Sequence, residues 1–212
     1  MKENVNLKLD WASHKMAKYS CENWHYSKCM PAGKLVKIGV WENDIFIGCV
    51  IYGRGANNNM AKHLNCEVTE CAELCRVALN KHKTEVTRIL SISRILLKKV
   101  CPSLKILFSY ADKTNQNHKG TIYIADNWEY MGERKTCNGA YYIINGKKIH
   151  GRSARAKYGS EKNFPSNYKN VESQVKHFFI KRVFNRRNSG DQLEKGSSNL
   201  THTLQKREAQ NG

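Results

Sequence analysis

Three side chains suited to proton transfer or hydrogen bonding follow one apolar run of the sequence. The run 104–110 leads to Asp112, and His118 and Tyr123 come soon after it. A short apolar run of this kind is typical of a buried strand, and ligands in open α/β sheets bind outside the carboxyl ends of strands. There, a carboxylate would accept hydrogen bonds from an amine substrate, and Tyr123 and Trp128 would stack on a base. The alternative is that Asp112 accepts hydrogen bonds from the backbone amides of its own loop and that both aromatic side chains belong to the hydrophobic core.

A second group of reactive side chains lies in the segment 21–33, which is too polar and aromatic for a simple core element. Surface loops of this type often carry function. The imidazole of His25 is a candidate proton acceptor, and the neighbouring Tyr26 phenol and Ser27 hydroxyl would position a substrate. The alternative is a structural histidine, whose hydrogen bonds are all made within a segment that covers the sheet. This role is the commoner one for a single histidine.

Basic side chains gather in the segment 80–84, where a strand is expected to pass into a helix. Free backbone amides and the helix dipole favour a bound phosphate at such a place. Lys81 and Thr84 are therefore candidates for holding a phosphorylated donor, with Arg76 and Arg88 on either side. Ordinary solvated charges at a helix start explain the same pattern. The sequence has no Ser-His-Asp arrangement, Walker loop or histidine-pair zinc motif.

The chain of 212 residues is strongly basic, with 36 Lys and Arg against 18 Asp and Glu and a formal net charge of +18. Residues 151–212 carry thirteen basic and five acidic side chains, a net of +8, so the other +10 lies in residues 1–150. A basic surface favours a polyanionic partner and raises its encounter rate. A basic surface that serves only solubility is the alternative.

The eight cysteines favour reduced thiols over a disulfide framework. The first residues lack the apolar segment of a secretory signal, and no run is long enough to span a bilayer. We therefore expect a cytoplasmic protein with no membrane association. Cys66, Cys71 and Cys75 lack the close pairs of a zinc site, so buried thiols acting as small hydrophobic residues are the simpler interpretation.

The order of the predicted elements indicates a mixed sheet. Runs of β-branched and aromatic residues predict strands at 35–41 and 45–52, joined as an antiparallel hairpin. A strand at 72–79, a helix that begins at Thr84 and ends before Pro102, and the strand 104–110 form a crossover unit. The two strands of such a unit should be parallel, with a right-handed connection.

The remaining sequence predicts an antiparallel end to the sheet and a basic extension. Three further strands are expected, at 129–134, 140–144 and 147–150, and Asn145-Gly146 is a strong hairpin signal between the last two. The fold class is thus α/β (α+β), a mixed, centrally parallel sheet flanked by helices. We expect three parts: a catalytic domain at 1–150, a basic C-terminal extension at 151–184 with a helix at 175–184, and a disordered tail at 185–212.

This order of elements resembles the GNAT acyltransferase fold over roughly residues 20–150, although the segment 80–84 replaces the glycine-rich pyrophosphate loop of that superfamily. The resemblance is closer still to the Mom family, a divergent GNAT branch that modifies phage DNA. Four stretches carry it: Trp24-His-Tyr-Ser27 with Pro31-x-Gly33, Phe46-Ile-Gly48 with Tyr52-Gly-x-Gly-Ala56, Glu73-Leu-Cys-Arg-Val77, and Ser109-Tyr-Ala-Asp112 with His118-x-Gly-x-Ile-Tyr123 and Asn127-Trp-x-Tyr130.

The resemblance to the Mom family implies an enzyme that places a carbamoylmethyl group on the exocyclic amine of adenine in double-stranded DNA. It implies catalytic residues at His25, Tyr26, Asp112 and Tyr123. Donor-binding residues are then expected at Arg76, Lys81, Thr84 and Arg88, and substrate-binding residues at Ser27, Tyr52, His118 and Trp128. An acyl-CoA-like donor and iron are the cofactors linked to the family, and a homodimer is compatible with the sequence.

We expect His25 or Asp112 to take the proton of the amine and Tyr26 or Tyr123 to orient the base or the donor. The modified DNA would resist the restriction enzymes of a bacterial host. Two other functions fit the same residues. One is a GNAT-type transferase acting on a protein, an aminoacyl-tRNA or a small amine, and the other is a non-catalytic DNA-binding protein.

Overall fold

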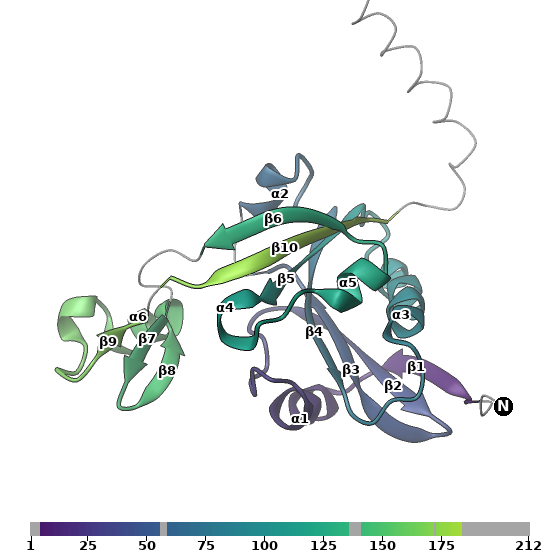
Figure 1. Cartoon of the computed structure of the whole chain (residues 1–212), viewed down its shortest axis with the longest axis horizontal. Coiled ribbons are helices and arrows are strands. Elements are labelled where there is room, and N and C mark those ends of the chain that lie inside the picture. Colours follow the sequence, from purple (N-terminus) through teal and green to yellow (C-terminus); the bar gives the residue numbers. More distant parts are fainter. Residues whose placement is uncertain (1–4, 56–58, 136–140, 172, 184–212) are drawn as a thin grey trace, which may run out of the picture. The chain divides into compact units, whose positions relative to one another are not determined.

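The computed structural model describes residues 5–55, 59–135, 141–171 and 173–183 (Figure 1). Seven strands of the described residues form the main sheet, in the order β1 (Leu7–Trp11), β2 (Leu35–Glu42), β3 (Ile45–Gly53), β4 (Cys71–Leu79), β5 (Ile106–Asp112), β10 (Val175–Arg182) and β6 (Glu129–Lys135). A separate sheet has the order β8 (Lys147–His150), β7 (Tyr141–Ile144) and β9 (Lys169–Asn170). The helices are α1 (His14–Trp24), α2 (Met60–His63), α3 (Val86–Val100), α4 (Lys113–Gln116), α5 (Thr121–Ala125) and α6 (Gly151–Tyr158), with a 3-10 turn at Glu161–Asn163.

The predicted fold class is confirmed, because the sheet is antiparallel at both ends and parallel where the crossover unit was expected. Strands β2 and β3 pair antiparallel, and Asn43 and Asp44 turn the chain between them with φ of 49° and 64°. Short polar side chains tolerate this left-handed conformation. Strands β4 and β5 pair in parallel through the crossover helix α3.

Helices α1 and α3 cover opposite faces of the main sheet. In β3, Cys49 and Ile51 pack against Ala17 of α1, whereas Tyr52 reaches Ser93 of α3. Because successive side chains of a strand point to opposite faces, these contacts place one helix on each side. The core therefore has three layers, and strand β3 is buried from both sides.

The prediction of a helix at 175–184 is wrong, because residues 175–182 form β10, between β5 and β6. Phe178 packs against Phe108 with ring centroids 6.4 Å apart, and Phe179 stacks on Tyr123 at 4.9 Å. A strand buried on both faces has a continuous apolar run without alternation, and such a run is easily taken for a helix. The main sheet thus includes part of the segment that we expected to be a C-terminal extension.

Two other expectations about the elements are corrected. The hairpin β7–β8 has the predicted antiparallel pairing, but it lies in the separate sheet and not at the end of the main one. That sheet has its own hydrophobic core, formed by Tyr142, Ile144, Ala154 and Phe164. The segment 21–33, expected as a surface loop, begins inside α1, whose N-cap Ser13 accepts a hydrogen bond from the Met16 amide. The predicted disordered tail lies outside the described residues.

The described part of the chain contains no helix with the length and apolar character needed to cross a membrane. The longest of these helices, α3, has 15 residues, and both of the last-turn residues Lys98 and Lys99 are charged. Its buried residues, Ile89, Leu90, Ser93 and Leu97, lie on one face. Spacing of three and four residues is the pattern of a helix that covers a sheet.

Candidate active site

A cavity of about 270 Å³ opens where the parallel strands part. Strands β4 and β5 are paired only from Cys71 to Glu73 on one side and from Ile106 to Phe108 on the other. At the next position of each strand the Ser109 hydroxyl donates to the Leu74 carbonyl at 2.7 Å, so a side-chain hydrogen bond replaces the backbone pairing. The cavity is lined by Trp24, His25, Tyr26, Val77, Tyr110, Ala111, His118, Ile122 and Tyr123.

His25 follows the last residue of α1 and is buried against this cavity. Its Nδ1 accepts the Ser27 amide at 3.1 Å and lies 2.8 Å from the Ser27 hydroxyl. Burial, followed by the charge of Arg76, lowers the pKa of His25 to about 3, so the ring is neutral at physiological pH. Ser27, predicted to bind substrate, therefore holds the His25 ring. The arrangement leaves Nε2 as the ring nitrogen available to a ligand.

His118 reaches the same cavity from the loop between α4 and α5. Its amide donates to the Asp112 carbonyl at 3.0 Å, and its Nδ1 accepts the Gly120 amide at 3.0 Å. Gly120 has a φ of 75° and its Cα faces the ring of Phe179, so any larger residue would be strained and would collide with that ring. The glycine thus lets the chain turn tightly enough to hold His118 beside α5.

Tyr123 and Tyr26 provide two of the three phenols that line the cavity, and Tyr110 provides the third. Tyr123 is buried, with its ring stacked on Phe179, and its hydroxyl lies 2.8 Å from the Ser109 hydroxyl. Burial raises the pKa of Tyr123, so the phenol stays protonated. The more exposed Tyr26 ring lies over His25, with ring centroids 4.2 Å apart. Burial raises the pKa of Tyr26 as well.

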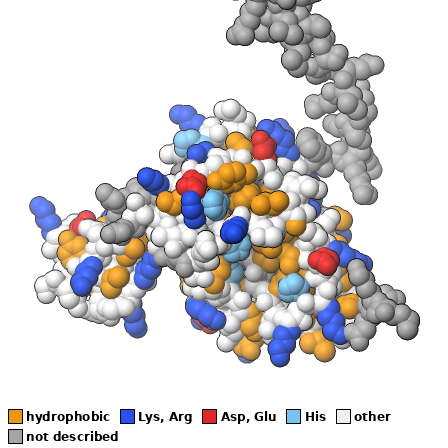
Figure 2. All heavy atoms as spheres, in the orientation of Figure 1, with side chains coloured by type: hydrophobic (Ala, Val, Ile, Leu, Met, Phe, Trp, Pro, Cys, Tyr) orange, Lys and Arg blue, Asp and Glu red, His pale blue; other side chains and the backbone are white. Residues whose placement is uncertain are grey.

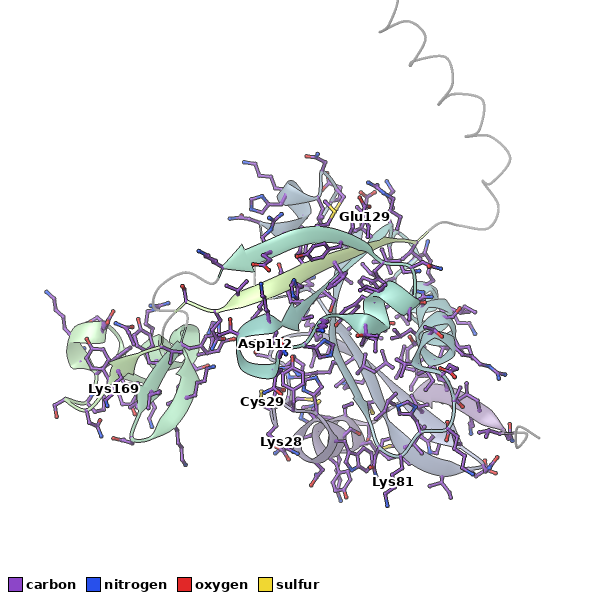
Figure 3. The ribbon with its side chains drawn as sticks, viewed as in Figure 1. Lys28, Cys29, Lys81, Asp112, Glu129 and Lys169 are labelled. Atoms are coloured by element: carbon purple, nitrogen blue, oxygen red, sulfur yellow. The ribbon has the colours of Figure 1, made fainter. Side chains whose placement is uncertain are left out.

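Asp112 and Arg76 bring opposite charges to the edge of the cavity. The Asp112 charge contributes to the raised pKa of Tyr26, whereas that of Arg76 acts on both His25 and Tyr26. The Arg76 guanidinium donates to the Cys75 carbonyl at 2.7 Å and to the Cys29 carbonyl at 3.4 Å. Figure 3 shows Cys29 and Asp112 in one region of the view and Lys81 well apart from them. Arg76 therefore belongs with the cavity and not with the segment 80–84.

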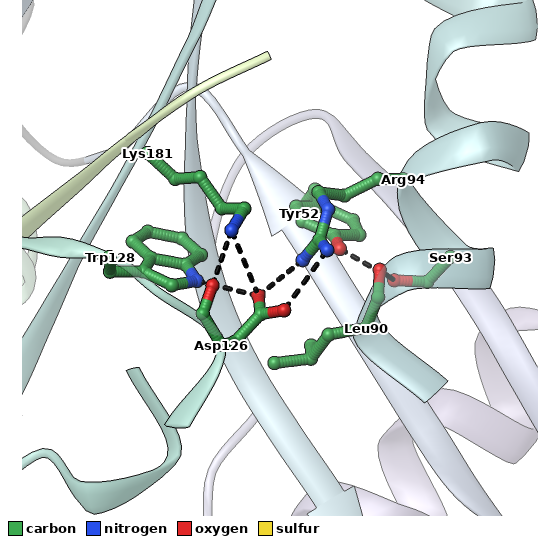
Figure 4. Close-up of polar contacts among 7 residues, drawn as sticks. All are labelled: Tyr52, Leu90, Ser93, Arg94, Asp126, Trp128 and Lys181. Carbon is green, nitrogen blue, oxygen red and sulfur yellow. Dashed lines mark hydrogen bonds and ion pairs between the residues drawn. The ribbon is translucent and has the colours of Figure 1, made fainter. Parts of the chain in front are cut away.

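Two residues predicted to bind substrate are structural. The hydroxyl of Tyr52, which is fully buried, lies 2.6 Å from Ser93 on α3 (Figure 4). The Trp128 indole donates to buried Asp126 at 2.8 Å, and Arg94 pairs with the same carboxylate. Neither predicted residue lines the cavity. The Trp128 ring packs 5.2 Å from the Tyr123 ring, so it supports the cavity wall from behind.

The amides of the segment 80–84 bind a carboxylate of the chain itself. The Glu42 side chain at the end of β2 accepts the Lys83 amide at 2.9 Å and the Thr84 amide at 2.6 Å. Burial opposes ionisation, but the hydrogen bonds from Thr84 and Lys83 outweigh it and lower the pKa of Glu42. The segment as it stands does not fit a donor phosphate, because Glu42 occupies these two amides. The side chains of Lys81 in this segment and of Arg88 in α3 are both exposed to solvent.

The residues of the cavity do not fit an iron site. Among the described residues, no three His, Cys, Asp or Glu side chains gather closely enough to hold a metal ion. The Nδ1 atoms of His25 and His118 both accept backbone amides, so neither Nδ1 atom is free to bind a metal, and each Nε2 carries the ring hydrogen in place of a lone pair. We therefore assign no step to iron.

Ser109 is the functional side chain that the sequence reasoning missed. It lies at the polar end of the run 104–110 and was given no role, yet it is buried and contacts both Leu74 and Tyr123. A hydroxyl inside an otherwise apolar strand was the available signal, since buried polar groups need partners. Val77, Tyr110 and Ile122, which also line the cavity, lie in stretches that carry the family resemblance but were given no role.

Comparisons with known proteins place these residues in a wider context. The sequence matches the family model described as the Mom protein family over residues 6–185, a range that includes every strand of the main sheet. A search of curated proteins gave no match. Similar solved structures include an aminoglycoside 6'-acetyltransferase type Ii (9% identity, TM-score 0.45, covering 84% of this chain and 99% of that chain). Two others are NAA60 of Arabidopsis thaliana in complex with a bisubstrate analogue (10%, 0.47, 84% and 100%) and a Bacillus subtilis acetyltransferase in complex with CoA (7%, 0.43, 85% and 100%).

Proposed function

This chain belongs to the Mom protein family, and from that membership and the geometry of the cavity we propose that it is a transferase acting on adenine in DNA. It places a carbamoylmethyl group on the exocyclic amine, and the modified phage DNA resists host restriction enzymes. The observation that carries the proposal is the meeting of His25, Tyr26, His118 and Tyr123 in one cavity at the ends of β4 and β5.

The size and walls of the cavity suit a single base taken out of the DNA stack. Its volume of about 270 Å³ is small for an extended ligand, since drug-sized sites occupy about 300–1,000 Å³. The Tyr26 ring is partly exposed, so it offers a flat face on which a base can stack. Enzymes that modify a base in duplex DNA extrude it into such a pocket.

Asp112 is the proton acceptor in this proposal. It ends strand β5 next to Ala111, which lines the cavity, and its charge acts on Tyr26. As the adenine nitrogen bonds to the transferred carbon, the bond between that carbon and the donor breaks and its electron pair leaves with the donor. The nitrogen loses a proton, and the Asp112 carboxylate takes it. The neutral His25 remains available for hydrogen bonding. Arg76 balances the negative charge that Asp112 brings to the edge of the cavity.

Mass spectrometry of nucleosides from cells that express the protein tests this function. We expect a new modified adenosine from the wild-type chain, and Asp112→Asn should reduce its amount by about 100-fold or more, as the loss of a general base does. The matched control is Asp44→Asn, which makes the same change at an exposed turn. If the wild-type chain gives no new adenosine, the function is wrong, and if Asp112→Asn retains full activity, the assignment of the base is wrong.

A further inference from the structure

The direction of the hydrogen bonds around Tyr123 is determined by its neighbours. The Leu74 carbonyl can only accept, so the single hydrogen of the Ser109 hydroxyl is donated to it, at 2.7 Å. The Ser109 oxygen must then accept from Tyr123, at 2.8 Å. The Tyr123 hydrogen is thereby committed to Ser109. A ligand in the cavity meets the Tyr123 oxygen through its lone pairs, as a hydrogen-bond acceptor.

The two histidines of the cavity have the opposite hydrogen-bonding role from Tyr123, because they offer a ligand a donor. A backbone amide can only donate, and the Ser27 and Gly120 amides point at Nδ1 of His25 and of His118, at 3.1 and 3.0 Å. Each Nδ1 is therefore unprotonated, and each ring carries its hydrogen on Nε2. The low pKa of His25 agrees with a neutral ring. Both imidazoles consequently offer a ligand a donor and no basic nitrogen.

We propose that these directions select an amino base such as adenine: the Tyr123 oxygen accepts from the exocyclic amine, and Nε2–H of His25 or His118 donates to the ring nitrogen beside that amine. Adenine presents an amine next to N1 on one edge and next to N7 on the other. Guanine and thymine place a carbonyl where the amine would be, opposite the Tyr123 oxygen, and two acceptors face each other. Cytosine also carries an amine beside a ring nitrogen, so these directions distinguish the amino bases from guanine and thymine and do not distinguish adenine from cytosine. Ser109 is then a positioning residue for base selection. This inference rests on the proposed function.

The first experiment removes single ring nitrogens from the target adenine. The purified full-length chain is supplied with a small-molecule extract of host bacteria and with DNA duplexes that contain adenine, 7-deazaadenine or 1-deazaadenine at one position. Mass spectrometry measures the rate at which the adduct forms. We expect one of the two analogues to react about tenfold more slowly or worse, because the donor loses its acceptor. His25→Ala or His118→Ala should remove that penalty while lowering activity on adenine.

The outcomes separate the inference from the function. If both analogues react as fast as adenine, or if the penalty persists in both histidine variants, the inference is wrong even though the function stands. If ordinary adenine gives no adduct, the proposed function fails and the inference falls with it. A penalty confined to 7-deazaadenine or to 1-deazaadenine supports the inference and identifies the edge of the base that is read.

A second experiment tests Ser109 with a matched control elsewhere in the molecule. Tyr52, Ser93 and the Leu90 carbonyl repeat the same relay, with distances of 2.6 and 2.8 Å, away from the cavity (Figure 4). Ser109→Ala frees the Tyr123 hydrogen to donate to a carbonyl. The preference for adenine over hypoxanthine DNA in competition assays should therefore fall about tenfold.

Ser93→Ala removes an equivalent buried hydroxyl and should leave that preference unchanged, although both variants lose stability. Equal preferences in Ser109→Ala and the wild-type chain would overturn the role of Ser109. Nitrogen chemical shifts of the labelled histidines supply an independent reading. They should show an unprotonated Nδ1 and a protonated Nε2 for His25, and the reverse pattern would overturn the inference.

Discussion

At the scale of single residues, the surroundings of a side chain decide its chemistry more than its type does. His25 was predicted as a proton acceptor, but burial and the neighbouring Arg76 keep it neutral, and the Ser27 amide occupies its basic nitrogen. Asp112 is therefore the better candidate for the base. Tyr123, predicted as catalytic, owes its orientation to Ser109, to which the sequence analysis gave no role.

The lowered pKa of His25 makes a prediction about stability. The unfolded chain binds a proton at His25 near pH 6.5, whereas the folded chain does so only near pH 3. His25 therefore leaves the free energy of unfolding unchanged above pH 6.5 and lowers it as the pH falls from 6.5 toward 3, by up to about 1.4 kcal/mol per pH unit. Urea unfolding at several pH values should show that the wild-type chain loses stability more steeply than His25→Asn. Parallel pH profiles of the two proteins would contradict the pKa.

At the scale of elements, the site depends on how strands and loops end. The cavity exists because β4 and β5 stop pairing after Glu73, and its back wall is completed by β10, whose Phe179 stacks on Tyr123. The segment 80–84 was expected to bind a donor phosphate by its position before α3. Its amides instead hold Glu42 from the end of β2.

Removing the Glu42 carboxylate should expose this anion site. We expect Glu42→Ala to lower the free energy of unfolding by about 2 kcal/mol, since amide hydrogen bonds to a charged group are lost. Inorganic phosphate should then raise the unfolding temperature of Glu42→Ala, because it binds the freed amides of the folded chain. The wild-type chain is the control and should gain little. If phosphate affects both proteins equally, Glu42 is not the group that occupies the site.

At the scale of the whole molecule, the basic charge is distributed over several elements. Lys and Arg side chains greatly outnumber acidic ones on the face shown in Figure 2. Residues 141–171 alone carry seven Lys and Arg and one acidic residue, Glu161. A surface of this charge suits the phosphate backbone of DNA, which binds through the release of counterions.

The charge predicts DNA binding that weakens steeply with salt. In fluorescence anisotropy, the slope of log affinity against log salt should fall in magnitude by about 0.9 for each phosphate contact that is removed. Lys162→Gln/Lys169→Gln changes two exposed side chains of the 141–171 segment and should reduce the slope by about 2. Lys8→Gln/Lys15→Gln makes the same change in charge at β1 and α1. Equal losses in both double variants would assign the binding to net charge alone.

Local patterns in the sequence determined the strands of the β2–β3 hairpin, the parallel crossover through α3 and the polar residues at the end of β5. These features depend on neighbours a few residues apart, which a pattern can record. Tertiary structure alone decided that β10 enters the main sheet, that Glu42 fills the segment 80–84, and that Ser109 orients Tyr123. Each of these contacts joins segments distant in sequence, and the direction of a hydrogen bond depends on which groups meet in space.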